Sequence, residues 1–236
     1  MNPESRPIAL SLVFPVFDEV DSLALLLKEA LRTAGHITPD FEIILVDDGS
    51  RDGSTRVIEN WCRNHPRIRA IHHATNNGYG SALRSGLRDA RGELVFFSDA
   101  DLQFDLGEIE KLIQHSDDFD IVAGYRNPRR DPWHRIAIAK LWGTIVRLLF
   151  GLEVRDIDCA FKIFRRETLQ HLPIASLGAF VNTEILVRAA SRGARIREVP
   201  VTHRRRRYGR PTGARPRVLL RAAVELLSLY RELRRY

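Results

Sequence analysis

An alternation of apolar runs with amphipathic segments, in the first half of the chain, is the feature that most constrains the fold. The short apolar runs predict strands, and the segments between them have the spacing of helices. We expect strands at 8–16, 41–48, 68–73 and 93–99, and helices at 19–34, 53–64 and 79–90. Strands that alternate with helices favour parallel pairing under a layer of helices, as in Rossmann-like α/β proteins.

The second half of the chain is less regular but continues the pattern. We expect helices at 108–116, 133–150 and 181–192, strands at 119–124, 159–164 and 195–201, and a last helix from about Pro216. A chain of 236 residues is long enough for one α/β domain with a sizeable core and short for two. We therefore assign residues 1–213 to one α/β domain and 214–236 to a C-terminal amphipathic helix.

Acidic residues follow three of the predicted strands. The clusters are Asp18–Glu19, Asp47–Asp48 and Asp99–Asp101. Ligands of open α/β sheets bind outside the carboxyl ends of the strands. We therefore expect the three clusters to converge on one edge of the sheet and to form the functional site.

The stretch FFSDADLQFD, residues 96–105, holds the most informative of these clusters. Carboxylates at i and i+2 of an extended strand point to the same side, and Gln103 has the same parity as Asp99 and Asp101. These oxygens are suited to one Mg²⁺ or Mn²⁺ that bridges a diphosphate. Without a cation the two carboxylates repel each other, so we expect them to be loosely ordered or paired with an arginine.

Two glycine-containing turns accompany the acidic clusters. In VDDGSRDGS, residues 46–54, Gly49 permits a tight turn that would leave Asp48 exposed, where it can accept hydrogen bonds from a nucleobase. In NNGYGSALRSGL, residues 76–87, Gly78 and Gly80 open a helix. Two glycines alone do not specify a phosphate loop, but the strand and the Asp-Ala-Asp that follow strengthen that interpretation.

Basic charge is concentrated near the C-terminus. Residues 199–224 contain no acidic residue, and their eight arginines are 204, 205, 206, 207, 210, 215, 217 and 221. Such a segment indicates nucleic acid, an anionic membrane or a phosphorylated ligand. A nucleic-acid-binding protein is the alternative of another class, but three acidic clusters would repel DNA or RNA. We therefore expect no nucleic-acid partner.

The remaining sequence signals concern the compartment and the membrane. Two cysteines, Cys62 and Cys159, form no disulfide framework, and no basic segment precedes the first apolar run as in a signal peptide. No uncharged apolar stretch reaches the length of a membrane span. The segments 133–152 and 216–236 are basic and amphipathic, which suits a membrane interface, the protein core or a dimer contact.

Seven motifs, in order along the chain, together resemble one family. They are VFPVFDE (13–19), VDDGSRDGS (46–54), NNGYGSALRSGL (76–87), DADLQ (99–103), GYR (124–126), RDIDCAFKIFRR (155–166) and EVPVTHRRRRYG (198–209). The chain resembles family 2 glycosyltransferases, and within them the dolichol-phosphate mannosyltransferases and polyprenyl-phosphate glycosyltransferases. The resemblance implies an α/β fold of the GT-A type, with a mixed, mostly parallel central sheet flanked by helices.

The resemblance also implies roles for individual residues. The residues implied in donor nucleotide binding are Pro15, Phe17, Glu19, Asp48 and Asp99. Those implied as ligands of the metal, Mg²⁺ or Mn²⁺, are Asp99, Asp101 and Gln103. Donor and acceptor phosphates fall to Arg126, Arg135, Arg204 and Arg206. The expected catalytic residues are Asp101, Arg126, Arg204, Arg206 and Asp156.

The chain departs from the family pattern in four places. Phe17 stands where a tyrosine is usual, and an extra carboxylate, Asp158, lies in the segment that usually reads Asp-x-Thr-Ser-Gly-Phe-Arg. GRPTG, 209–213, replaces the usual Gly-x-Ser-Lys. The usual trailing transmembrane helices are missing, so anchoring would be peripheral, through a membrane partner protein, or absent.

The expected activity is inverting transfer of a hexose from a GDP- or UDP-sugar to a polyprenyl phosphate such as undecaprenyl or dolichyl phosphate. A lipid phosphate is already anionic and needs cationic positioning rather than a general base. The open alternative is a sugar or lipid hydroxyl acceptor with Asp156 or Asp158 as the base. A sugar-1-phosphate nucleotidyltransferase is disfavoured by the acidic PVFDEVDS, residues 15–22, and a catalytically dead scaffold by Asp99 and Asp101. We expect a cytoplasmic protein that is peripheral at the inner face of the membrane. The sequence is also compatible with a homo-oligomer.

Overall fold

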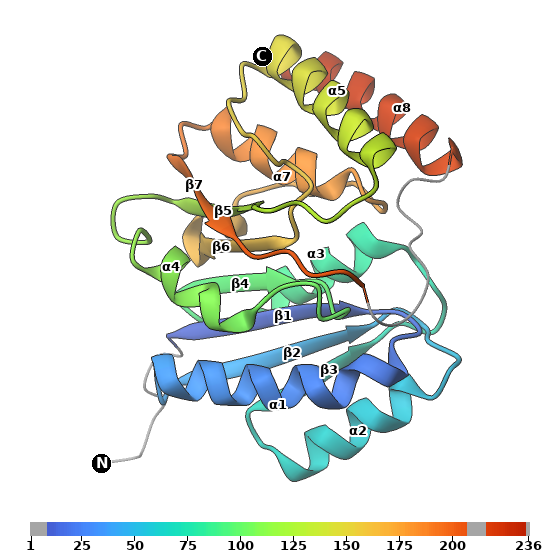
Figure 1. Ribbon diagram of the computed structural model, residues 1–236, viewed down its shortest axis with the longest axis vertical. Coiled ribbons are helices and arrows are strands. Elements are labelled where there is room, and N and C mark those ends of the chain that lie inside the picture. Colours follow the sequence, from blue (N-terminus) through green and yellow to red (C-terminus); the bar gives the residue numbers. More distant parts are fainter. Residues whose placement is uncertain (1–8, 207–215, 235–236) are drawn as a thin grey trace.

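The computed structural model describes residues 9–206 and 216–234 and shows one α/β sandwich (Figure 1). Within these residues seven strands form one sheet in the order β3-β2-β1-β4-β6-β5-β7. The strands are β1 (Leu10–Val16), β2 (Phe41–Asp47), β3 (Ile68–His72), β4 (Leu94–Ser98), β5 (Ile121–Arg126), β6 (Phe161–Arg165) and β7 (Ile196–Val201).

Strand direction is mixed in this sheet. β1 pairs in parallel with both β2 and β4, β2 with β3, and β5 with β7. Only β6 runs antiparallel to its two neighbours, β4 and β5, among the strands of the described part. The predicted mixed, mostly parallel sheet is therefore confirmed.

Helices cover both faces of the sheet, with α1 and α3 on opposite sides of β1 and β2 (Figure 1). The helices are α1 (Val20–Ile37), α2 (Ser54–Asn64), α3 (Tyr79–Asp89), α4 (Ile109–Ile113), α5 (Trp133–Phe150), α6 (Arg166–Gln170), α7 (Val181–Ala190) and α8 (Pro216–Leu233), with a 3-10 turn η1 (Leu106–Glu108). The predicted strands and helices are all present. The short helix α6 was not predicted, because its five residues are too few to show a helical period.

The core lies on both sides of the central strands. Every residue of β1 and β2 is buried, which explains why their sequences are mostly apolar, with Ser11, Glu42 and Asp47 as exceptions, rather than alternating. Gly86 of α3 allows this helix to approach closely, because a Cβ there would lie 2.4 Å from Cγ1 of Val13. The first half of the sheet is therefore a rigid support for the loops at its carboxyl edge.

Helices α5 and α8 lie side by side at the end of the molecule far from α1 and α2 (Figure 1). The Phe150 and Tyr230 rings meet edge to face between them, with centroids 5.8 Å apart. α8 is tied to α7 by Arg188, whose guanidinium binds both oxygens of Glu232 at 2.7 and 2.9 Å. None of the helices in the described part of the chain has the length and hydropathy of a membrane-spanning segment.

Some sequence predictions fall on residues outside the described ones. These are the signal-peptide assessment at 1–8, arginines 207, 210 and 215, GRPTG at 209–213, and the domain boundary between 213 and 214. They stay predictions.

Candidate active site

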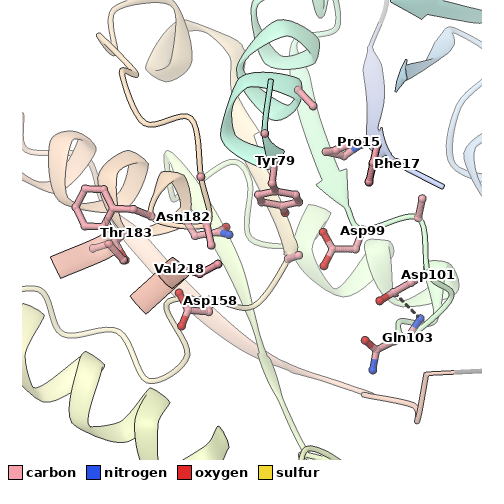
Figure 2. Close-up of a pocket in the computed structure, with 18 of the residues that line it drawn as sticks. Pro15, Phe17, Tyr79, Asp99, Asp101, Gln103, Asp158, Asn182, Thr183 and Val218 are labelled. Carbon is pink, nitrogen blue, oxygen red and sulfur yellow. Dashed lines mark hydrogen bonds between the residues drawn. The ribbon is translucent and has the colours of Figure 1, made fainter. Parts of the chain in front are cut away.

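A cavity of about 790 Å³ opens at the carboxyl ends of β1, β2 and β4 (Figure 2). The structure brings ten of the twelve predicted site residues to its wall: Pro15, Phe17, Glu19, Asp48, Asp99, Asp101, Gln103, Arg126, Arg135 and Arg206. Arg204 and Asp156 are not part of the wall. The three acidic clusters therefore converge on one edge of the sheet, as strand periodicity and parallel pairing predict.

The turn after β1 is held by the turn after β2. The backbone N–H of Asp18 donates to Ser50 Oγ at 3.1 Å, and that of Glu19 donates to Ser54 Oγ at 3.0 Å. In return Arg51 N–H donates to Asp18 Oδ1 at 2.8 Å. This interlock fixes the backbone on either side of Glu19, whose carboxylate pairs with Arg206.

Asp48 does not have the exposed position that the turn predicts. Its side chain is buried, and its carboxylate accepts hydrogen bonds from the backbone N–H groups of Asn77 and Gly78 at 2.9 and 2.8 Å. His73 Nδ1 lies 2.7 Å from the same carboxylate. The predicted exposure is wrong, because the loop before α3 folds over the turn and donates hydrogen bonds to Asp48. Asp48 thus supports the cavity wall. Its role in nucleotide binding stays a prediction.

The two glycines at the start of α3, Gly78 before the helix and Gly80 in its first turn, serve packing. Gly78 has φ +99°, and a Cβ on Gly80 would lie 2.6 and 2.7 Å from the carbonyl oxygens of Ser176 and Gly178. Gly80 N–H also donates to the Leu177 carbonyl at 3.0 Å. The start of α3 is thereby pressed against the loop before α7, which places Tyr79 in the cavity (Figure 2).

Asp99, Asp101 and Gln103 lie in a row along one side of the cavity (Figure 2). The reason is not strand parity, because β4 ends at Ser98 and Leu102 has φ +60°. Asp101 Oδ1 accepts a hydrogen bond from Gln103 N–H at 3.1 Å. Gln103 Nε2 donates to the carbonyl of Arg204 at 3.1 Å, so this side chain is tied to the segment after β7.

Arg206 compensates part of the acidic charge. Its Nη1 lies 3.3 Å from Asp101 Oδ2, and its Nη2 pairs with Glu19. The predicted pairing of the Asp-Ala-Asp carboxylates with an arginine is thus found for Asp101. The remaining carboxylate, Asp99, has an oxygen, Oδ1, that is buried and has no hydrogen-bond partner among the described residues.

The surroundings of Glu19, Asp99 and Asp101 disfavour the ionised form of these carboxylates. Burial, and then repulsion from Asp101, raise the pKa of Asp99 to about 7. Burial also raises the pKa of Asp101 and of Glu19, and Arg206 opposes the rise in both. One guanidinium for three close carboxylates leaves room for a further cation. The described residues contain no group of three or more His, Cys, Asp or Glu side chains placed to hold a metal, so a bound ligand would have to supply other oxygens.

A second charged network lies across the cavity around Arg126. Its Nε and Nη2 bind both oxygens of Asp156 at 2.7 and 2.6 Å, and its Nη1 lies 3.1 Å from Asp131. Arg135 pairs with Asp131 at 3.1 Å. Burial would raise the pKa of Asp156, but hydrogen bonds and charge from Arg126 outweigh it and lower the pKa. Asp156 is thus an anchor for Arg126.

Asp158 differs from Asp156 in its surroundings. It lines the cavity on the side opposite Asp101, near Asn182 and Thr183 (Figure 2). Its side chain is exposed to the cavity. Desolvation by the protein around the cavity, and then repulsion from Asp156, raise the pKa of Asp158. A carboxylate with a raised pKa in an open cavity is able to accept a proton.

Buried Lys162 holds the loop that carries Asp158. Its Nζ donates to the carbonyl oxygens of Ile157 (3.0 Å) and Cys159 and to Asn182 Oδ1 (3.1 Å). The three donors of the ammonium are thus all used. This network links β6, the Asp158 loop and α7 behind the cavity.

Comparison with known proteins fits this geometry. The family model described as glycosyl transferase family 2 matches residues 11–172. The chain belongs to glycosyl transferase family 2. Two curated relatives carry the name undecaprenyl-phosphate 4-deoxy-4-formamido-L-arabinose transferase: one from Edwardsiella ictaluri, 32% identical over 204 residues, and one from Proteus mirabilis, 33% identical over 205 residues. Each match covers 85% of this chain and 61% of the relative, so the chain spans about three fifths of the length of these relatives.

Solved glycosyltransferase structures share the fold of this family 2 chain. Glucosyl-3-phosphoglycerate synthase from Mycobacterium tuberculosis, in complex with Mn²⁺, UDP and phosphoglyceric acid, superposes with a TM-score of 0.75 at 21% identity and covers 94% of this chain and 78% of its own. A mannosyltransferase from Pyrobaculum calidifontis with GDP-mannose and Mn²⁺ has a TM-score of 0.63 at 19% identity, over 88% of this chain and 59% of its own. The predicted GT-A fold is confirmed.

Arg204 of this glycosyltransferase family member lies outside the cavity wall, unlike most of the other predicted site residues. Its guanidinium pairs with Asp105 at 2.7 Å, and its N–H donates to the Gln103 carbonyl at 2.7 Å. Tyr79, Asn182 and His203 are among the polar residues of the cavity wall that the sequence did not single out. Tyr79 lies inside a recognised motif, whereas Asn182 belongs to a helix without any sequence signal of function.

Proposed function

We propose that this chain is a metal-dependent inverting glycosyltransferase that transfers a sugar from a nucleoside-diphosphate sugar to a polyprenyl phosphate. The observation that carries the proposal is the cavity that joins Glu19, Asp99 and Asp101 to Arg206 at the carboxyl edge of the sheet. Membership of glycosyl transferase family 2 and relatives named for transfer to undecaprenyl phosphate support it. The relatives are longer than this chain, so their activity is carried over only as a proposal.

Asp99 and Asp101 are the residues that would hold Mg²⁺ or Mn²⁺. The unpartnered Asp99 oxygen and the excess of carboxylates over cations fit such an ion, and two solved relatives of the fold contain Mn²⁺. When bound, the ion would neutralise charge on the leaving diphosphate. Gln103, the third predicted ligand, has its amide nitrogen on the Arg204 carbonyl, which leaves the amide oxygen to face another group.

Arginines of the cavity wall would position the phosphates. Arg206 holds Glu19 and Asp101 together, and a diphosphate oxygen can replace either carboxylate as its partner. Arg126, anchored by Asp156, and Arg135 would present positive charge from the other side of the cavity. Preorganised cations of this kind stabilise the charge that grows on the leaving group in the transition state.

A phosphate acceptor suits this site better than a hydroxyl acceptor. A lipid phosphate attacks without losing a proton, and the salt bridge to Arg126 removes Asp156 from use as a base. Asp158 is the observation that favours a second candidate, transfer to a sugar or lipid hydroxyl with Asp158 as the base, because it faces the cavity and has a raised pKa. A polyprenyl phosphate would bring the protein to the cytoplasmic face of a membrane.

A panel of GDP- and UDP-sugars with Mn²⁺, with and without undecaprenyl phosphate, tests the proposal. The panel includes hexoses, as the sequence predicts, and 4-deoxy-4-formamido-L-arabinose, the sugar in the names of the relatives, which we would supply as its UDP derivative. We expect one donor to yield a lipid-linked sugar only when the lipid phosphate is present and EDTA is absent. Transfer to a hydroxyl acceptor alone would support the second candidate. No turnover of any donor, and binding of oligonucleotides instead, would contradict both.

A further inference from the structure

Helix α5 is apolar and yet largely exposed. Its eighteen residues contain no acidic side chain, and only Val146 is buried. An amphipathic helix of a globular protein normally turns its apolar side chains toward the core. The core of this chain leaves many apolar side chains of α5 uncovered. This indicates that α5 contacts a partner.

The same is true of the outer face of α8. In the described residues ten large hydrophobic side chains are exposed, and seven of them lie on these two helices. They are Trp133, Ile138, Leu141 and Leu148 on α5 and Leu220, Val224 and Leu227 on α8. Isolated exposed hydrophobics are ordinary, but a concentration on adjacent helices marks an interaction surface. We name these seven residues the α5–α8 apolar surface.

The charge around this surface is basic. Lys140 and Arg147 are exposed on α5 and Arg231 on α8. The two acidic residues of α8 already have partners: Glu225 binds Ser176 and Arg221, and Glu232 binds Arg188. An apolar surface with basic side chains fits the interface of an anionic bilayer. Two copies of the chain joined through this surface would bring like charges together.

The α5–α8 apolar surface borders the active-site cavity. The inner sides of the two helices line the cavity with Ala139 and Trp142 from α5 and Val218, Leu219 and Ala222 from α8. Ile138, a member of the α5–α8 apolar surface, also reaches the cavity. Each helix therefore has one side toward the cavity and another toward solvent. A bilayer bound to the outer faces would therefore lie one helix diameter, roughly 10 Å, from the cavity.

We propose that the α5–α8 apolar surface binds an anionic lipid bilayer and sets the cavity against the membrane. The role in delivery of the acceptor rests on the proposed function, whereas lipid binding by itself does not. The occupant is the bilayer surface, reached without a membrane-spanning helix in the described residues.

Co-sedimentation with vesicles tests this surface. We compare vesicles of phosphatidylcholine alone with vesicles that also contain phosphatidylglycerol, in the absence of donor and acceptor. The full chain should bind the anionic vesicles, and added salt should weaken the binding. The double variant L141Q/L148Q on α5 and the double variant L220Q/L227Q on α8 should each lower the partition coefficient at least about tenfold. Glutamine is a good helix former, so both helices are retained.

Leu25 supplies the matched control. It is 43% exposed on α1, at the other end of the molecule (Figure 1), so Leu25→Gln should leave vesicle binding unchanged. Circular dichroism and thermal melting confirm that the variants are folded. The proposal is overturned if the unaltered chain does not bind vesicles, if both double variants bind as well as it does, or if ultracentrifugation shows that the variants instead break a dimer.

The outcomes separate this surface from the proposed function. If the chain binds vesicles but transfers no sugar, the proposed membrane surface is supported and the proposed function is contradicted. If the chain transfers sugar to a short, water-soluble prenyl phosphate but does not bind vesicles, the proposed function is supported and the proposed membrane surface is contradicted. If both hold, the double variants should lose transfer to undecaprenyl phosphate in vesicles and retain transfer to the short acceptor.

Discussion

Arg206 Nη1 lies 3.3 Å from Asp101 Oδ2, although 105 positions separate the two residues in the chain. This contact joins the segment after β7 to the loop after β4, and the same guanidinium reaches Glu19 after β1. The site is therefore held by electrostatic contacts between loops distant in sequence. An arginine that neutralises the carboxylates in the absence of metal also competes with a metal for them.

That competition leads to a prediction for Arg206→Met. Without donor, Mn²⁺ should bind this variant more tightly than the unaltered chain, because Asp101 and Glu19 lose their cationic partner. With donor, transfer should fall about a hundredfold or more, because a cation that stabilises the leaving diphosphate is lost. Electron paramagnetic resonance of free Mn²⁺ and steady-state kinetics measure the two effects. Weaker Mn²⁺ binding without donor would mean that Arg206 organises the metal site and does not compete for it.

Asp101→Asn should strongly impair transfer while the protein stays folded. The amide is isosteric but removes the charge that would hold the metal, for which a loss of about 10²–10³ in kcat is expected. The exposed Asp118, on the loop after α4, provides the control, and Asp118→Asn should have normal activity. Full activity of Asp101→Asn in the presence of EDTA would contradict a metal role.

The sequence alone predicted the sheet and the edge at which the site lies. Hydrophobic period and parallel pairing are local or topological properties, and they place Glu19, Asp48 and Asp99 after neighbouring strands. The partners of these side chains were not predictable in the same way. Asp48 binds N–H groups of Asn77 and Gly78, and which loop reaches a carboxylate first depends on the three-dimensional course of the chain.

The same limit applies to side-chain direction. The prediction that Asp99, Asp101 and Gln103 point to one side assumed that the extended strand continues past the end of β4. Instead Leu102 adopts φ +60°, and Gln103 contacts Arg204. A left-handed leucine is uncommon and has no sequence signature. Asp156 and Asp158 looked equivalent as bases for a related reason. The pairing of Asp156 with Arg126 and the exposure of Asp158 to the cavity distinguish them.

Two glycines provide a paired test of packing at the cavity. Gly80→Ala would place a Cβ 2.6 Å from the Ser176 carbonyl, so it should destabilise the protein by about 1–3 kcal/mol and raise the KM for the donor. Gly143 lies within α5, with no atom within 4 Å of an added Cβ, so Gly143→Ala should stabilise by about 1 kcal/mol. Chemical denaturation measures both. Equal effects of the two variants would show that the contact of α3 with the loop before α7 is unimportant.

Glu42 should make stability depend on pH in the acid range. Burial would raise its pKa, but hydrogen bonds from Arg69, Ser11 and the backbone of Arg91 lower it below 4.5. A lowered carboxyl pKa contributes stability that is present above the unfolded value and lost as the pH falls through the folded value. Glu42→Gln should therefore cost about 1–3 kcal/mol at pH 7, with a difference that shrinks below about pH 4.

Urea denaturation at a series of pH values checks this prediction. The exposed Glu59 on α2 serves as the control, and Glu59→Gln should show no such pH dependence. A stability difference for Glu42→Gln that stays constant from neutral to acid pH would assign its effect to shape and not to charge.

Asp158→Asn distinguishes the two candidate acceptors. If the acceptor is a lipid phosphate, no base is needed, and kcat should change less than about tenfold. If the acceptor is a hydroxyl, loss of the base should lower kcat by about 10²–10⁴ and remove the acid limb of the pH profile. The raised pKa of Asp158 puts that limb above the usual range of an aspartate. Asp156→Asn is the companion variant: because Asp156 anchors Arg126, it should impair transfer with either acceptor, and an unimpaired Asp156→Asn would show that the Arg126 network is not used.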